Sequence, residues 1–171
     1  EPILKYGNMP RAAQYLPDDQ NLSSDVGIEL EVVQCSQCGL IQLNQPPVPY
    51  YREVIRAASV SKEMTAFRIA QFKHFIDRFA LWRKKFIEIG CGRGEYLSIL
   101  ERCGVEAYGI EYAEASVKEG RKQGLKIMRG SLERKTDRLP NAPFDAFVIL
   151  NFLEHLPDPR EVLQGIRNNL S

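Results

Sequence analysis

Short apolar runs alternate with mixed, amphipathic stretches along the second half of the chain. The apolar runs are KFIEIG, EAYGIE, KIMRGS and FDAFVILNF, and the first two mixed stretches, GEYLSILERCG and AEASVKEGRKQG, each end at a glycine. Apolar runs of this length predict buried strands, and the mixed stretches predict helices. Strands that alternate with helices are typical of a parallel sheet with helices on both faces. We therefore expect an α/β fold with a doubly wound sheet over residues 85–171.

A helix is predicted before this alternating region. Residues 60–82 contain neither proline nor glycine. Their apolar side chains Phe72, Phe75, Ile76 and Phe79 recur at the spacing of one helical face. His74 lies on the opposite side of that helix, so we expect it to be an exposed surface residue.

The sequence also predicts where the last helix begins. The tetrapeptide Asp158-Pro159-Arg160-Glu161 follows the fourth apolar run. Aspartate is a favourable N-cap, proline suits the first helical position, and a glutamate three residues after the cap completes a capping box.

Residues 1–52 differ from the rest because they carry six of the ten prolines. The segments IELEVVQ and LIQLN predict two short strands on either side of a C-x-x-C turn formed by Cys35 and Cys38. We expect a β-hairpin with a metal-binding knuckle at its tip. The expected domains are an incomplete knuckle module over 1–52, a linker and helix over 53–84, and the α/β domain over 85–171.

Composition restricts the partners of this protein. The 171 residues include 23 basic and 22 acidic side chains, for a net charge of +1. This balance gives no electrostatic reason to expect nucleic acid or an anionic membrane as a partner. No apolar run approaches the roughly 20 residues of a membrane span, and the N-terminus lacks a signal-peptide pattern. The four cysteines are too few for a disulfide scaffold, so we expect a reduced, cytoplasmic protein.

The most specific chemical signal is the glycine loop EIGCGRGEYL between the first strand and its helix. Glycines at positions 90, 92 and 94 allow a tight turn and a close approach to a ligand. The dinucleotide fingerprint is G-x-G-x-x-G, with a pyrophosphate at the helix N-terminus. Here the spacing is shorter and Glu95 follows at once, and a carboxylate is a poor neighbour for pyrophosphate. With Glu88 inside the strand, the loop favours a cationic ligand that carries no phosphate.

A second acidic residue completes this pattern. Glu111 ends the second strand, 21 residues after Gly90. A carboxylate at that distance can accept hydrogen bonds from both hydroxyls of a ribose.

The loop EIGCGRG, the strand-end Glu111 and the segment FDAFVILNFLEHLPDP together resemble class I S-adenosylmethionine (SAM)-dependent methyltransferases, over about residues 60–171. The resemblance implies a Rossmann-like sheet, SAM as cofactor, and transfer of its methyl group to a small molecule. It also implies roles for particular residues. On the family's pattern Gly90, Gly92 and Gly94 cradle the methionine and ribose parts, Glu88 faces the amino group, Glu111 takes the ribose hydroxyls, Tyr112 lies beside the adenine, Ser131 and Leu132 border the adenine pocket, and Asn151 lies near the methyl group.

His155 is the candidate general base for the reaction. It follows the fourth strand, at the mouth of the expected crevice. An unperturbed imidazole pKa near 6.5 suits proton removal from an acceptor. The alternatives are that His155 merely packs the turn before Pro157, or that Glu154 is the base.

The N-terminal segment, GNMPRAAQYLP with CSQCGLIQL, is similar to a zinc-binding domain that precedes the SAM domain in a subset of these enzymes. That subset includes C-methyltransferases that act on nucleotide-linked deoxysugars. The resemblance implies that Cys35 and Cys38 are half of a structural zinc site, whose other pair precedes Glu1. Members often carry tyrosines where this chain has Ile55 and Ala57, which weakens the expectation of a sugar acceptor.

The chain stops one helix after the fourth strand, which leaves an uncovered sheet edge. We expect either a homodimer through that edge or, preferably, a piece of a longer enzyme that lacks turnover by itself. Two other functions stay open. One is a non-catalytic module that recruits nucleic acid or protein, and the other is an NAD-dependent oxidoreductase.

Overall fold

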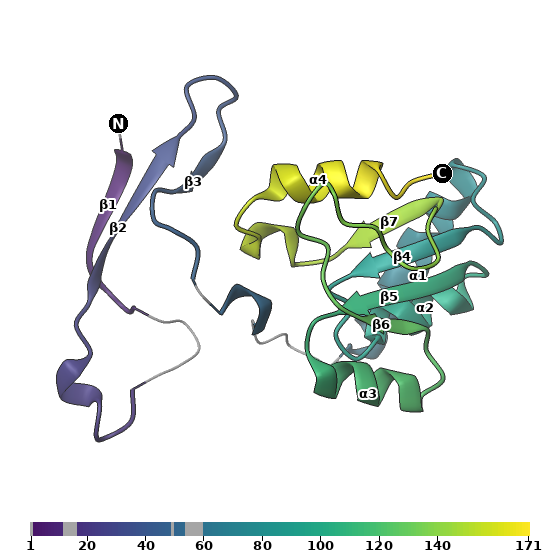
Figure 1. The fold of residues 1–171 in the computed structure, drawn as a ribbon, viewed down its shortest axis with the longest axis horizontal. Helices are drawn as coiled ribbons and strands as arrows, with labels where there is room; N and C mark the ends of the chain where they lie inside the picture. Colours follow the sequence, from purple (N-terminus) through teal and green to yellow (C-terminus); the bar gives the residue numbers. More distant parts are fainter. Residues whose placement is uncertain (1, 12–16, 49, 54–59) are drawn as a thin grey trace. The chain divides into compact units, whose positions relative to one another are not determined.

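The computed structural model describes residues 2–11, 17–48, 50–53 and 60–171. The predictions concerning Ile55 and Ala57 fall outside these residues. The chain forms two compact units, Glu1–Pro49 and Tyr50–Ser171 (Figure 1). Residues 50–53 and the helix that begins at Lys62 fall in the unit that contains the parallel sheet, and the domain boundaries expected from the sequence stay a prediction.

The first unit is a three-stranded antiparallel sheet. Strands β1 (Pro2–Met9), β2 (Ile28–Gln34) and β3 (Ile41–Leu43) pair in the order β1-β2-β3. The β2–β3 hairpin lies where the sequence predicted it, with the C-x-x-C turn between its strands. Strand β1 was not predicted, because proline and glycine interrupt its pattern. An ion pair from Lys5 to Glu31 links it to β2 at 2.8 Å.

The second unit contains the predicted parallel sheet. Its strands are β4 (Lys85–Ile89), β5 (Glu106–Glu111), β6 (Ile127–Arg129) and β7 (Ala146–Ile149). They pair in the order β6-β5-β4-β7, and all three pairings are parallel (Figure 1). The chain moves outward from β4 to β6 and then crosses to the other side of β4. This reversal of direction confirms an α/β fold wound on both sides of β4.

An apolar core covers each face of the sheet, and successive side chains along a strand point alternately into one core and the other. Phe86 of β4 packs into one core with side chains of α1 (Lys62–Arg78), α2 (Glu95–Arg102) and α3 (Glu114–Lys122). Its neighbour Ile87 points into a second core, which Ile166 of α4 (Pro159–Arg167) joins. Side chains that follow one another along a strand point to opposite faces, so two apolar cores require almost continuously apolar strands.

Helix α1 buries a narrower face than its sequence suggests. Phe72 and Ile76 are buried, but Phe75 is 38% exposed and Phe79 is 55% exposed. The helix also ends at Arg78, before a positive φ of 53° at Ala80. The core side of α1 is therefore the line of positions 72 and 76, and Phe75 and Phe79, which share the same apolar face by their spacing, are more exposed.

Helix α4 begins at the predicted cap. The Asp158 carboxylate accepts hydrogen bonds from the backbone N–H groups of Arg160 and Glu161, at 3.0 and 3.1 Å. The Glu161 side chain takes another role than the predicted capping box. Its carboxylate accepts from the backbone N–H of Lys135 at 3.2 Å, which ties α4 to the loop after β6.

The outer side of the sheet next to β7 is partly occupied by the last residues of the chain. Leu170 pairs with Phe144 as a parallel bridge. The Phe144 N–H donates to the Asn169 carbonyl, and the Ser171 N–H donates to the Phe144 carbonyl, both at 2.9 Å. Within the part of the chain that the structure describes, no helix is long and apolar enough to cross a membrane.

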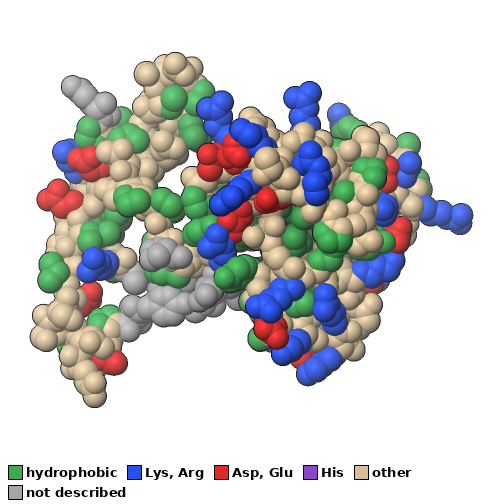
Figure 2. Space-filling view, in the orientation of Figure 1, with side chains coloured by type: hydrophobic (Ala, Val, Ile, Leu, Met, Phe, Trp, Pro, Cys, Tyr) green, Lys and Arg blue, Asp and Glu red, His purple; other side chains and the backbone are tan. Residues whose placement is uncertain are grey.

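Basic and acidic side chains are interspersed on the face of the molecule shown in Figure 2. Ion pairs account for part of this pattern. Glu114 at the start of α3 binds Lys118 at 2.7 Å, as its i, i+4 spacing favours, and Arg129 of β6 at 3.0 Å. The second pair joins the helix to the edge strand of the sheet.

Candidate functional site

A cavity of about 280 Å³ opens at the carboxyl ends of the parallel strands. The glycine loop after β4 and the residues after β7 both line it. In a doubly wound sheet the chain leaves these two strands toward opposite faces, which opens a crevice between them. Seven of the predicted site residues line the cavity: Gly90, Gly92, Glu111, Tyr112, Ser131, Asn151 and His155.

Gly90 brings the backbone close to an aromatic side chain of the cavity. Its φ is 67°, and a Cβ atom there would lie 2.9 Å from the ring of Phe152. Gly94 serves the core instead, because a Cβ atom there would lie 2.3 Å from Leu125. The structure therefore places Gly90 at the cavity, and it places Gly94 at the start of α2, outside the residues that line the cavity.

Glu111 is held rigidly at the end of β5. One carboxylate oxygen accepts the N–H of Gly92 at 2.9 Å, and the other accepts the N–H of Ala113 at 2.8 Å. A carboxylate offers about four lone pairs, so each oxygen retains capacity for a ligand hydroxyl. The side chain joins two loops, and it presents a fixed acceptor to the cavity that it lines.

Two other predicted residues lie in the interior and are not among those that line the cavity. Glu88 is fully buried on β4. Leu132 is 1% exposed and packs in the second apolar core, with Phe144. The pattern of strand-end residues did not reveal this, because their burial depends on the helices and loops that cover them.

Asn151, Phe152 and His155 form the opposite wall of the cavity. Asn151 has a φ of 51°, which turns the chain sharply after β7. The short 3-10 helix Leu153–His155 follows, and the N–H of His155 donates to the Phe152 carbonyl at 3.0 Å. This turn sets the half-buried His155 at the cavity, as the sequence predicted for a residue just past the fourth strand.

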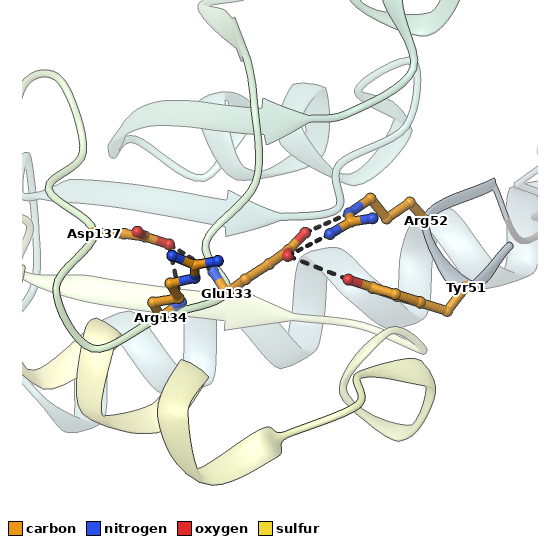
Figure 3. Close-up of polar contacts among 5 residues, drawn as sticks. All are labelled: Tyr51, Arg52, Glu133, Arg134 and Asp137. Atoms are coloured by element: carbon orange, nitrogen blue, oxygen red, sulfur yellow. Dashed lines mark hydrogen bonds and ion pairs between the residues drawn. The ribbon is translucent and has the colours of Figure 1, made fainter. Parts of the chain in front are cut away.

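Tyr51 and Arg52 also line the cavity, and sequence reasoning missed both. Arg52 binds Glu133 through two hydrogen bonds of 2.6 Å, and the Tyr51 hydroxyl donates to the same carboxylate at 3.2 Å (Figure 3). The Arg52 guanidinium lowers the pKa of Glu133 and has its own pKa raised by that carboxylate, while burial raises the pKa of Tyr51. No local motif signals these contacts, because 81 residues separate Arg52 from Glu133.

In the first unit, the C-x-x-C turn has a well-defined shape. The N–H of Cys35 donates to the Leu40 carbonyl at 2.8 Å, and the N–H of Gly39, which has a φ of 75°, donates to the Cys35 carbonyl at 2.9 Å. Backbone N–H groups of Cys38 and Gln37 lower the pKa of the Cys35 thiol by hydrogen bonding. Among the described residues, no group of three or more His, Cys, Asp or Glu side chains could hold a metal ion.

The chain was compared with known protein families and with individual proteins. Residues 64–171 match the family described as a methyltransferase domain. Over 91 residues the chain is 32% identical to a ubiquinone biosynthesis O-methyltransferase of Idiomarina loihiensis. The matched region is 50% of this chain and 37% of that protein. The enzyme of the same name from Hahella chejuensis is 35% identical over 95 residues, which are 52% of this chain and 40% of that protein. The chain thus spans about two fifths of the length of these relatives.

Solved structures also resemble this fold. The plantazolicin methyltransferase BpumL in complex with SAH superposes with a TM-score of 0.53 at 19% identity, covering 64% of this chain and 45% of that one. A complex of the same enzyme with SAH and a triazolic desmethylPZN analog gives a TM-score of 0.54 at 18% identity, covering 65% and 45%. At this level of identity the likeness concerns the fold.

Proposed function

The chain belongs to the family of methyltransferase domains, and on this basis we propose that it binds SAM and serves transfer of the methyl group to a small-molecule acceptor. The observation that carries the proposal is Glu111. Its carboxylate is fixed by the N–H groups of Gly92 and Ala113 at the edge of a cavity between the glycine loop and Asn151. Its remaining lone pairs suit the two hydroxyls of a ribose.

The residues around the cavity fit this cofactor. Gly90 and Gly92 permit a close backbone approach, and Tyr112 and Ser131 would flank the adenine. When bound, SAM would supply a methyl group on a sulfonium, which is a good leaving group. The protein's task is then to hold the acceptor in line with that methyl group and to exclude water. Glu95 also lines the cavity, at the first position of α2, and its charge disfavours the pyrophosphate of a nicotinamide dinucleotide.

For Glu88, Gly94 and Leu132 we propose supporting roles. Glu88 lies fully buried on β4, and Leu132 lies in the second apolar core. Gly94 opens α2 and leaves room for Leu125. Each would help to hold the loops around the cavity in position without contacting the ligand.

The nature of the acceptor is a further part of the proposal. The relatives named above are O-methyltransferases of ubiquinone biosynthesis, so an oxygen acceptor is the first candidate. None of them supports the nucleotide-linked sugar that the N-terminal resemblance implied. Methylation in the presence of candidate acceptors, followed by NMR of the product, would distinguish an O-methyl from a C-methyl group.

Calorimetric titration with SAM tests the cofactor proposal. Wild-type protein should bind SAM, and Glu111→Gln should weaken binding by roughly tenfold or more, because it removes a charged acceptor from ligand hydroxyls. Glu119→Gln, at a half-exposed position of α3, is the matched control and should bind as wild type does. A folded sample that binds NADH and shows no heat with SAM would overturn the proposal.

We further propose His155 as general base. Replacing it with alanine in an enzyme with turnover should lower kcat by at least tenfold and leave SAM affinity unchanged, because proton removal contributes about 10²–10⁴-fold to rates. His74→Ala, on the exposed side of α1, is the matched control. A change in kcat of less than tenfold for His155→Ala would remove it from the base role.

For the first unit we propose that Cys35 and Cys38 are half of a structural zinc site. The N–H groups directed at the Cys35 thiol would stabilise a thiolate ligand. The other ligands would come from outside the described residues. Measurement of the zinc content tests this. We expect less than one zinc ion per chain, weakly held, and one tightly bound zinc ion that persists in Cys35→Ser would refute the assignment.

We also propose a cytoplasmic location for the protein. All four cysteines are free thiols, which suits a reducing compartment.

A further inference from the structure

Arg52 makes a doubly hydrogen-bonded ion pair at the cavity. Its Nε and Nη2 atoms each lie 2.6 Å from an oxygen of Glu133, which is a bidentate arrangement (Figure 3). The Tyr51 hydroxyl donates to the same carboxylate at 3.2 Å. Bidentate guanidinium–carboxylate pairs combine strength with a defined orientation. The turn Tyr51–Glu53 is thus anchored, through two adjacent side chains, to the loop that follows β6.

Glu133 is itself held in place from behind. The backbone N–H groups of Glu133 and Arg134 both donate to the Asp137 carboxylate at 2.9 Å (Figure 3). The Asp137 carbonyl accepts from the side chain of Asn169, also at 2.9 Å. Asn169 is 1% exposed. The carboxylate that receives Arg52 is therefore mounted on a turn that is tied to the end of α4.

The guanidinium also meets two aromatic rings of the cavity wall. Its Cζ atom lies 4.6 Å from the ring centre of Tyr51 and 5.5 Å from that of Tyr112. All three residues line the cavity, and Tyr112 is 46% exposed. Cation–π contacts of this geometry are attractive. The Arg52 guanidinium therefore lies over the ring of Tyr112, the residue next to Glu111. Because Glu133 neutralises the charge of Arg52, the pair adds no net positive charge that would repel a cationic ligand.

We propose that Tyr51 and Arg52 form a strap over the Tyr112 side of the cavity, that Glu133 is its latch, and that the strap positions and retains the adenosine part of the cofactor. The inference rests on the proposed function, because it assigns these residues to the same SAM site. Arg52 and Glu133 act through Tyr112 and Tyr51, so they are positioning residues. Opening the latch should chiefly speed the departure of the ligand.

Binding kinetics of SAM test the proposal. Arg52→Ala and Glu133→Gln should each raise the dissociation rate roughly five- to tenfold, with a smaller change in the association rate. The double variant should be no worse than the poorer single variant, because the two residues act as one unit. Arg52→Lys keeps the charge but loses the bidentate geometry, so it should fall between wild type and Arg52→Ala. Lys118→Ala, which breaks the Glu114 pair on α3, is the matched control and should bind as wild type does.

A second measurement needs no ligand. Hydrogen–deuterium exchange at residues 50–53 should be faster in Glu133→Gln than in wild type, while exchange in β4 and β5 stays the same. Unchanged exchange would refute the latch whatever the protein binds. Faster exchange with an unchanged SAM dissociation rate would refute its role at the cofactor. A folded wild-type protein that does not bind SAM would instead defeat the proposed function, and the retention role with it.

Discussion

At the scale of single residues, the cavity depends on a glycine at a position where any larger residue would strain the backbone and collide with a neighbouring ring. Gly90 adopts a positive φ of 67° and lies against the Phe152 ring. Gly124 also has a positive φ, 83°, but a Cβ atom there would meet nothing within 4 Å. The two glycines therefore share a backbone cost and differ in their surroundings, which allows a controlled comparison.

Gly90→Ala should both destabilise the protein and impair the site. The positive φ costs roughly 1 kcal/mol at either glycine when alanine is introduced. At Gly90 the new methyl group must also displace the ring of Phe152, which lines the cavity, so SAM affinity should fall by roughly tenfold. Gly124→Ala should lose similar stability and keep its affinity. Equal affinities for the two variants in calorimetry would contradict this account.

The Arg52–Glu133 pair should make stability depend on pH. The folded protein lowers the pKa of Glu133 below that of the unfolded chain. The contribution of the pair is therefore fully present above the unfolded pKa and is lost as the pH falls below the ordinary glutamate pKa and through the lower folded pKa. Urea unfolding should show wild type more stable than Glu133→Gln at pH 7, with the difference shrinking as the pH falls below the ordinary glutamate pKa. A difference that is independent of pH would exclude an ionic origin.

At the scale of elements, one buried side chain joins helix α4 to the loop after β6. Asn169 accepts the N–H of Leu139 at 2.9 Å and donates to the carbonyls of Asp137 and Gly165, at 2.9 and 2.8 Å. Its neighbour Asn168 makes an exposed contact with the Lys135 carbonyl at 2.8 Å. The buried contacts fix the loop that carries Ser131 and Glu133, so a structural residue at the end of α4 supports the cavity from a distance.

Asn169→Ala should cost about 2–4 kcal/mol of unfolding free energy, because it leaves buried backbone groups without partners. Asn168→Ala, in the next position, should cost less than about 1 kcal/mol, since water replaces its exposed contact. Chemical denaturation of both variants gives the comparison. Similar losses for the two residues would show that the buried hydrogen bonds of Asn169 are not the main connection between α4 and the loop after β6.

At the scale of the whole molecule, the boundary between the units bears on function. The second unit begins at Tyr50 and so includes the strap. The first unit contains the C-x-x-C turn. The homodimer through the edge of β7 stays a prediction, and the last residues already occupy the beginning of that edge, beside Phe144.

Two truncated chains test this boundary. A protein of residues 50–171 should bind SAM like the full chain, because it retains the parallel sheet and the strap. A protein of residues 60–171 should bind with the faster dissociation of Arg52→Ala. Binding kinetics and a thermal unfolding curve for each are sufficient. If both truncated proteins are folded and bind alike, the strap has no role in retention.

The sequence by itself determined the order of strands and helices in the second unit, the place of the glycine loop after β4, the position of Glu111 at the end of β5, and the cap at Asp158. These features are local, because apolar spacing and backbone conformation act between residues that are close along the chain. The spacing did not show that Phe75 and Phe79 are more exposed than Phe72 and Ile76, because the width of a buried helix face depends on what packs against it.

Only the tertiary structure decided which side chains surround the cavity. It put Glu88 and Leu132 in the interior, and it brought Arg52 to Glu133 across 81 residues of sequence. Such contacts leave no periodic trace in the chain, because they arise where loops from separate strands meet at one edge of the sheet.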